Sequence, residues 1–68
     1  MQLSARNQIE GKVKGVRTDG LMAEVTVDVG GGQELVSTIT KASADRLKLA
    51  QGDAVTVVIK ASEVLIAK

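Results

Sequence analysis

Two short clusters of hydrogen-bond donors, one near each end of the chain, are the residues best suited to chemistry. The first is Ser4-Ala5-Arg6-Asn7-Gln8, which holds four polar side chains and no acid. The second is Lys60-Ala61-Ser62, which follows an apolar run. Guanidinium, ammonium, hydroxyl and amide groups all donate hydrogen bonds to an anion. Each cluster also has a purely structural interpretation. The first could be a solvated N-terminal segment, and the second a lysine that ends a strand.

The two clusters together predict a pocket made almost wholly of donors: Ser4, Arg6, Lys60, Ser62 and nearby backbone N–H groups. Such a pocket suits a fully deprotonated oxyanion, because every oxygen of the anion accepts. Phosphate at neutral pH often carries a proton that needs an acceptor, and a buried unpaired polar group costs about 1–3 kcal/mol. Molybdate, tungstate and sulfate are dianions at neutral pH, so selection against sulfate would depend on the size of the pocket.

The composition argues against several classes of function. Without His or Cys there is no Ser-His-Asp triad, no thiolate nucleophile and no typical zinc site, so we expect a binding protein rather than an enzyme. With no aromatic residue and a net charge of +1, a module that binds single-stranded nucleic acid is disfavoured. No apolar run approaches the roughly 20 residues of a membrane span. The sequence predicts a cytoplasmic protein with no nucleic-acid or membrane partner.

Alternation of apolar and polar residues predicts five strands, over 9–16, 21–29, 34–40, 54–60 and 63–67. A three-residue loop, 18–20, with Gly20 at positive φ would join the first two strands and set Lys14 opposite Glu24. Leu21 and the odd-numbered residues after it would face inward. Gly11 and Gly15 would face inward too, and would let a neighbouring backbone approach closely or let the strand coil. Residues 30–32, all glycine, predict a second hairpin turn.

The one predicted helix covers residues 41–49, with Thr40 as its N-cap and Ala44, Leu47 and Leu49 facing inward. The fold class is therefore all-β, a small OB-like five-stranded antiparallel barrel with one short helix between strands three and four. At 68 residues, 44% of them hydrophobic and none aromatic, the single domain has a thin core. Self-association would add stability.

Three segments resemble the molybdenum-binding Mop domain, a TOBE-like domain found in molbindins. They are the opening Ser4-Ala5-Arg6-Asn7-Gln8, the region around the helix, and the closing Lys60-Ala61-Ser62-Glu63-Val64. In the helix region the matching residues are Ile39, Thr40, Ser43, Leu47, Leu49 and Gly52. The resemblance covers essentially the whole chain in register, so residues 1–68 are identified as a single Mop domain.

The resemblance implies a cytoplasmic protein for molybdenum storage and homeostasis that binds molybdate or tungstate at subunit interfaces. It implies a homohexamer built as a trimer of dimers. The anion contacts would come from the protein's hydrogen-bond donors, with no metal coordinated directly by side chains. Carried over by motif, the contacts fall on Ser4, Ala5 (backbone), Arg6, Lys60, Ala61 (backbone) and Ser62, with Asn7 either a direct ligand or a support.

Two alternatives stay open beside this interpretation. One is a regulatory module that senses molybdate and acts on a protein partner through apolar residues such as Met22 and Leu65. The other is binding of a molybdenum-pterin cofactor. A pterin ring usually lies in an aromatic or apolar slot with several polar contacts. Because the chain has no aromatic residue to stack on a pterin, we consider the cofactor a weaker candidate ligand than the bare anion.

Overall fold

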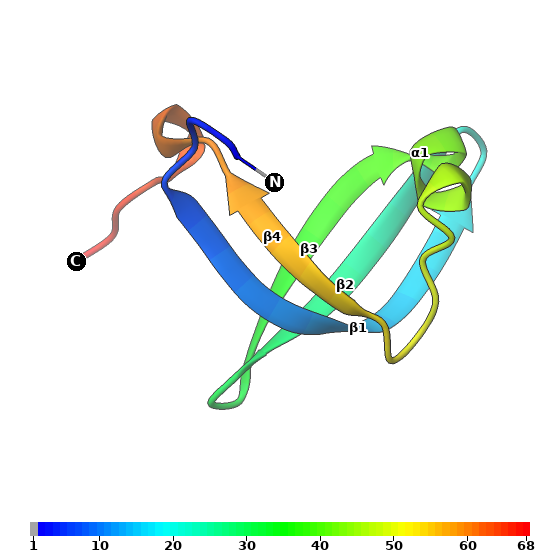
Figure 1. Ribbon diagram of the computed structural model, residues 1–68, viewed down its shortest axis with the longest axis horizontal. Helices are drawn as coiled ribbons and strands as arrows, with labels where there is room; N and C mark the ends of the chain where they lie inside the picture. The colour runs from blue at the N-terminus through cyan, green and yellow to red at the C-terminus, as the bar shows by residue number, and fades with distance from the viewer. Residues whose placement is uncertain (1) are drawn as a thin grey trace.

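Four antiparallel strands form one strongly curled sheet, with a short helix at one end of it (Figure 1). The computed structural model describes residues 2–68. The strand order is β3-β2-β1-β4, so β3 and β4 are the outer strands. No helix in this part of the chain has the length and apolar character needed to cross a membrane. The elements in chain order are β1 (Asn7–Asp19), β2 (Met22–Gly30), β3 (Gln33–Thr40), α1 (Lys41–Arg46), β4 (Ala54–Ile59) and the 3₁₀ turn η1 (Ala61–Glu63).

The turn between β1 and β2 is shorter than the sequence predicted. The two strands stay paired up to Asp19 and Met22, so only Gly20 and Leu21 remain in the turn. Gly20 has the expected positive φ, at 59°. Leu21 is 85% exposed instead of facing inward, because it lies in the turn and outside the alternation of β2. The prediction of a three-residue loop was therefore wrong.

A β-bulge in β1 explains the error. The pairing of β1 with β2 shifts between Val13 and Gly15, which leaves Lys14 as the extra residue. As a result Arg17, and not Lys14, is paired with Glu24. The bulge also displaces Gly15, where an added Cβ would meet no atom within 4 Å. A single inserted residue leaves no mark in the apolar pattern, so the parity argument from sequence could not detect it.

Valines from the two central strands make the core. Val13, Val25 and Val27 are almost fully buried and form one cluster. Gly11 confirms the predicted close approach, since its backbone lies directly against β2. The partly buried residues that pack on the cluster are Val16, Val29, Ile39, Leu49, Val55 and Val57. The core is thus aliphatic and lies on the concave side of the curled sheet.

The helix begins as predicted and ends three residues early. The Thr40 hydroxyl accepts a hydrogen bond from the Ser43 N–H, and Ala44 is buried. Lys48 adopts a left-handed conformation with φ 53°, which stops the helix after Arg46. Leu47 is left 60% exposed, contrary to the prediction that it faces inward. Leu49 does pack against the core.

The predicted fifth strand does not form in the single chain. After β4 the backbone enters η1, where the Glu63 N–H donates to the Lys60 carbonyl at 2.9 Å. Residues 64–68 have no regular structure and are exposed. Because η1 directs the chain outward, this segment meets neither outer strand. The structure is accordingly a four-stranded, open half-barrel.

Candidate oxyanion-binding site

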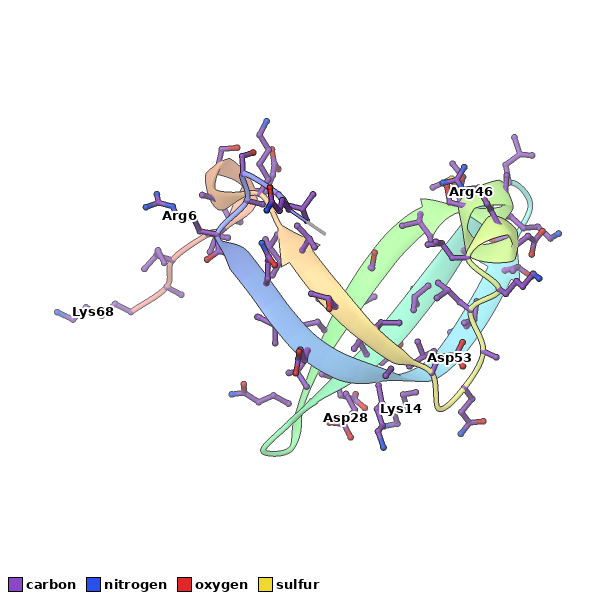
Figure 2. The ribbon with its side chains drawn as sticks, viewed as in Figure 1. Arg6, Lys14, Asp28, Arg46, Asp53 and Lys68 are labelled. Carbon is purple, nitrogen blue, oxygen red and sulfur yellow. The ribbon has the colours of Figure 1, made fainter. Side chains whose placement is uncertain are left out.

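The N-terminal cluster lies at the entrance to β1. Residues 4–6 precede the strand, and Asn7 is its first residue. The Gln8 side-chain amide donates to the Ala5 carbonyl oxygen at 2.7 Å, which ties the bend to the start of the strand. Arg6 is exposed and its side chain points outward from this corner of the molecule (Figure 2).

The C-terminal cluster lies where β4 ends. Lys60 is the residue before η1 and has an extended backbone, with φ −66° and ψ 128°. Within η1 the Lys60 and Ala61 carbonyls accept from Glu63 and Val64. The first N–H groups of such a turn, here those of Ala61 and Ser62, have no carbonyl within the turn to bond. They are therefore available to an acceptor outside it.

The pairing of β1 with β4 brings the two clusters to the same corner. Asn7 pairs with Ile59 at the end of that ladder. Arg6 and Lys60 are each one residue beyond this pair, at the ends of the neighbouring strands β1 and β4, although they are 54 positions apart in sequence. Figure 1 shows the N-terminal segment and η1 side by side at the end of β4. The structure thus places the predicted residues in one region.

The corner is open to solvent in the single chain. Of the seven predicted residues, Ala5 is half-buried and Ser4, Arg6, Asn7, Lys60, Ala61 and Ser62 are exposed. No hydrogen bond joins their side chains across the two segments in the described residues. An anion held here by one chain alone would keep much of its hydration, and competing water weakens such contacts.

The ion pairs within residues 2–68 lie away from this corner. Lys41 Nζ is 3.1 Å from Asp45 Oδ2, one helical turn along α1. Lys14, on the bulge, is paired with Glu34 of β3. The hydrogen bond and the charge of Glu34 raise the pKa of Lys14 above its usual 10.5. Neither pair involves Arg6 or Lys60.

An apolar groove lies elsewhere on the molecule, and the sequence prediction did not include it. Its volume is about 660 Å³, and residues of both outer strands line it. The lining residues are Val25, Val27, Ser37, Ile39, Leu47, Leu49, Asp53, Ala54, Val55, Thr56, Val57 and Val58. The sequence did contain a hint of this groove. Val55 and Val57 are the inward-facing valines of β4, and they stay uncovered if residues 63–67 do not form a strand over them. A smaller hollow beside the first hairpin is lined by Arg17, Thr18, Asp19, Met22, Ala23, Glu24 and Thr38.

Comparison with known proteins places this architecture in a family. Residues 3–66 match the TOBE domain. The chain is 39% identical to molybdenum-pterin-binding protein 1 of Clostridium pasteurianum, over 97% of each chain. It superposes on a molybdate-binding protein of Sporomusa ovata with a TM-score of 0.93 and 40% identity, covering all of both chains. The chain therefore belongs to the TOBE-domain family, in its molybdenum-binding Mop, or molbindin, branch.

A third similar protein is longer than this chain. It is the cytoplasmic molybdate-binding protein ModG, in a structure with molybdate bound. The TM-score is 0.90 and the identity 43%, over 96% of this chain and 46% of ModG. A domain of this kind therefore also occurs as part of a larger molecule.

Proposed function

We propose that this chain is a cytoplasmic molybdate- or tungstate-binding protein that serves molybdenum storage and homeostasis. Residues 1–68 act as a single binding domain with no catalytic role. The anion is held by Ser4, Arg6, Lys60, Ser62 and the backbone of Ala61 and Ala5, with Asn7 as a ligand or support. One observation carries the proposal: the β1–β4 ladder brings Arg6 and Lys60 to one corner, each beside the Asn7–Ile59 pair.

The donor set supports a fully deprotonated dianion. Arginine, lysine and serine side chains and turn N–H groups all donate, and charge-assisted hydrogen bonds to an oxyanion are among the strongest in proteins. A protonated phosphate presents an O–H that this set leaves without an acceptor. The similar proteins of Sporomusa ovata and ModG are both described as molybdate-binding.

The exposure of the corner supports binding between subunits. In one chain the donors face water on an open surface. A second chain across the corner would remove that water and strengthen each hydrogen bond in the lower dielectric. Two cationic surfaces repel each other without the anion, so a dianion between them stabilises the assembly. We propose that the assembly is a homohexamer, a trimer of dimers, with the site repeated at each equivalent interface.

The bare anion is favoured over a molybdenum-pterin cofactor. The relative from Clostridium pasteurianum is named for pterin binding. The apolar groove of this chain is lined by aliphatic residues and has no aromatic ring to stack on a pterin. The second candidate is a regulatory or partner-binding module that senses molybdate, and the exposed apolar residues Met22 and Leu65 are the observation that favours it.

Isothermal titration calorimetry with molybdate tests the proposal. It compares the wild type with a variant of the site and with a control variant elsewhere on the molecule. Removing both cations in Arg6→Ala/Lys60→Ala should weaken binding about a hundredfold or more, since hydrogen bonds to charged groups contribute about 1.5–3 kcal/mol each. The matched control is Arg46→Ala/Lys48→Ala, which removes the same charge at the end of α1 and two residues beyond it; Figure 2 shows Arg46 at the end of the molecule opposite Arg6. The control should bind like the wild type. Equal affinity of all three proteins would disprove the site.

A further inference from the structure

Three carbonyl oxygens at the candidate site are hydrogen-bonded within the chain itself. The Lys60 and Ala61 oxygens accept from backbone N–H groups three residues further along, at 2.9 and 3.3 Å. The Ala5 oxygen differs, because its donor is a side chain: the Gln8 amide donates to it at 2.7 Å. Each of these oxygens is turned toward its own donor. A substitution at Gln8 can therefore free one acceptor at the site and leave the backbone of the turn η1 intact.

Strand β1 fixes the position of Gln8. It is the second residue of β1 and lies opposite Val58 in the ladder with β4. Opposite residues of an antiparallel pair have Cβ atoms about 4.5–5.5 Å apart, so the aliphatic stem of Gln8 lies beside Val58. Within residues 2–68, no backbone-to-backbone hydrogen bond is made by residues 4–6. The orientation of the bend before β1 therefore depends on the Gln8 amide.

The hydrogen bond from Gln8 sets the direction of a whole peptide group. The Ala5 carbonyl and the Arg6 N–H belong to one planar trans peptide, so they point in opposite directions. With the oxygen turned toward Gln8, the Arg6 N–H points away from it and has no backbone partner in the described part of the chain. A reversed peptide would present an oxygen in place of this donor. A carbonyl oxygen only accepts, so it repels an anion that carries no proton.

We infer that Gln8 determines the selectivity of the site for fully deprotonated oxyanions, by holding the Ala5 carbonyl oxygen where it cannot accept a proton of the ligand. The inference rests on the proposed function, because it concerns the same anion site. Hydrogen phosphate is rejected because the donors of the site leave its O–H without an acceptor. Without the Gln8 amide the Ala5–Arg6 peptide is free to turn, and its oxygen then accepts that O–H. Gln8 is thus a positioning residue, which acts on the anion through the backbone of Ala5.

Competition titrations test this role of Gln8. Protein loaded with molybdate is titrated with sulfate or with phosphate at about pH 8, where both competitors are mainly dianions of similar size and phosphate alone carries a proton. The variant Gln8→Met keeps nearly the same side-chain length and removes the donor. Phosphate should then become about tenfold more effective relative to sulfate, because its O–H gains a partner. Molybdate should bind the variant more weakly, since the freed oxygen repels it.

Two further variants separate the hydrogen bond from other effects of the substitution. Gln33→Met makes the same change at the exposed first residue of β3, and it should keep the wild-type ratio of the two competitors. Gln8→Lys restores a donor at the position, and it should return the ratio toward that of the wild type. The added charge attracts both dianions alike, so it raises both affinities and leaves their ratio unchanged.

The outcomes separate the inference from the proposed function. If Gln8→Met weakens the binding of both competitors in parallel, or changes neither, Gln8 has no part in selectivity and the inference fails while the proposed function stands. Failure of phosphate to displace molybdate from Gln8→Met overturns the inference in the same way. If the wild type binds no molybdate, the proposed function itself fails, and the inference with it.

Discussion

Gly11 is the glycine at which the fold leaves least room for a side chain. An ideal Cβ built there would lie 2.6 Å from the Asp28 carbonyl oxygen and 2.6 Å from a methyl carbon of Val27. The carbonyl belongs to the β2 backbone and cannot swing aside as a flexible side chain would. The β1–β2 packing therefore depends on the absence of a side chain at this position.

The variant Gly11→Ala should lower the free energy of unfolding by about 1–3 kcal/mol, as overpacking of a filled site does. The matched control is Gly15→Ala, where an added Cβ meets nothing within 4 Å. That control should change stability by less than about 0.5 kcal/mol. Urea unfolding of both variants at one protein concentration makes the comparison, and equal stabilities would contradict the close approach.

The structure predicts a distinct pH response for Lys14, which is paired with Glu34. Its pKa is raised above 10.5 by the hydrogen bond and charge of Glu34, with a smaller contribution from Asp28. Since the folded pKa is the higher one, the stabilisation from this pair is present below pH 10.5 and is lost as the pH rises through the folded pKa. Lys14→Met should therefore show a smaller fall in Tm between pH 9 and pH 12 than the wild type. An identical alkaline fall in both proteins would show that the pair contributes nothing.

At the scale of elements, α1 ends in a backbone conformation that is unfavourable for the residue that adopts it. The Lys48 N–H donates to the Asp45 carbonyl and the Leu49 N–H to the Ala44 carbonyl, at 3.0 and 3.1 Å. This is the Schellman arrangement, in which the left-handed position is usually glycine. Here Lys48 occupies it with φ 53°.

Lys48→Gly should stabilise the protein by about 1 kcal/mol, because a non-glycine residue in the left-handed region costs about 1–2 kcal/mol. Lys48→Ala is the control that removes the charge and keeps the strain, and it should not stabilise. Thermal unfolding followed by circular dichroism compares the two. A Tm of Lys48→Gly no higher than that of Lys48→Ala would contradict this account of the helix end.

Strands β1 and β2 show when the inward and outward faces of a strand can be predicted from the sequence. Strict alternation in β2 correctly predicted Ala23, Val25 and Val27 as inward residues, because the pairing of β2 with β3 is regular from Met22 to Asp28. The pattern failed in β1, where the bulge at Lys14 adds a residue without changing the apolar order. Periodicity reports which side chains share a face only while the backbone stays regular.

The candidate site could be predicted in part, from residue types and not from periodicity. The donor character of the two clusters is visible in their residue types, and the structure brings them to one corner through the pairing of Asn7 with Ile59. The absence of a strand over residues 63–67 was not predictable, because the apolar residues of this segment do not show whether an outer strand of the sheet lies within its reach.

At the scale of the whole molecule, the core is thin, so we expect a bound ligand to make a clear contribution to stability. Only Val13, Ala23, Val25, Val27 and Ala44 are buried hydrophobic residues in the described chain. A ligand that binds the folded assembly alone adds about 2.7 kcal/mol at a hundredfold excess over Kd. The predicted oxyanion should therefore have a clear effect on thermal stability.

Molybdate and tungstate should each raise the Tm in a concentration-dependent way, and phosphate should have little effect. The reason is that the donor-only site penalises a protonated oxygen. Differential scanning calorimetry of the wild type and Arg6→Ala/Lys60→Ala at equal ionic strength makes the measurement. The rise should vanish in the double variant. A similar rise with phosphate would indicate a general salt effect.

The most direct measurement is the position of the anion itself. Crystals grown with molybdate or tungstate, and diffraction data recorded near an absorption edge of the metal, would give an anomalous-difference map that locates each metal atom. We predict peaks between subunits, with the oxyanion within hydrogen-bond distance of Arg6, Lys60 and Ser62. Well-occupied peaks remote from that corner in every subunit would contradict the account.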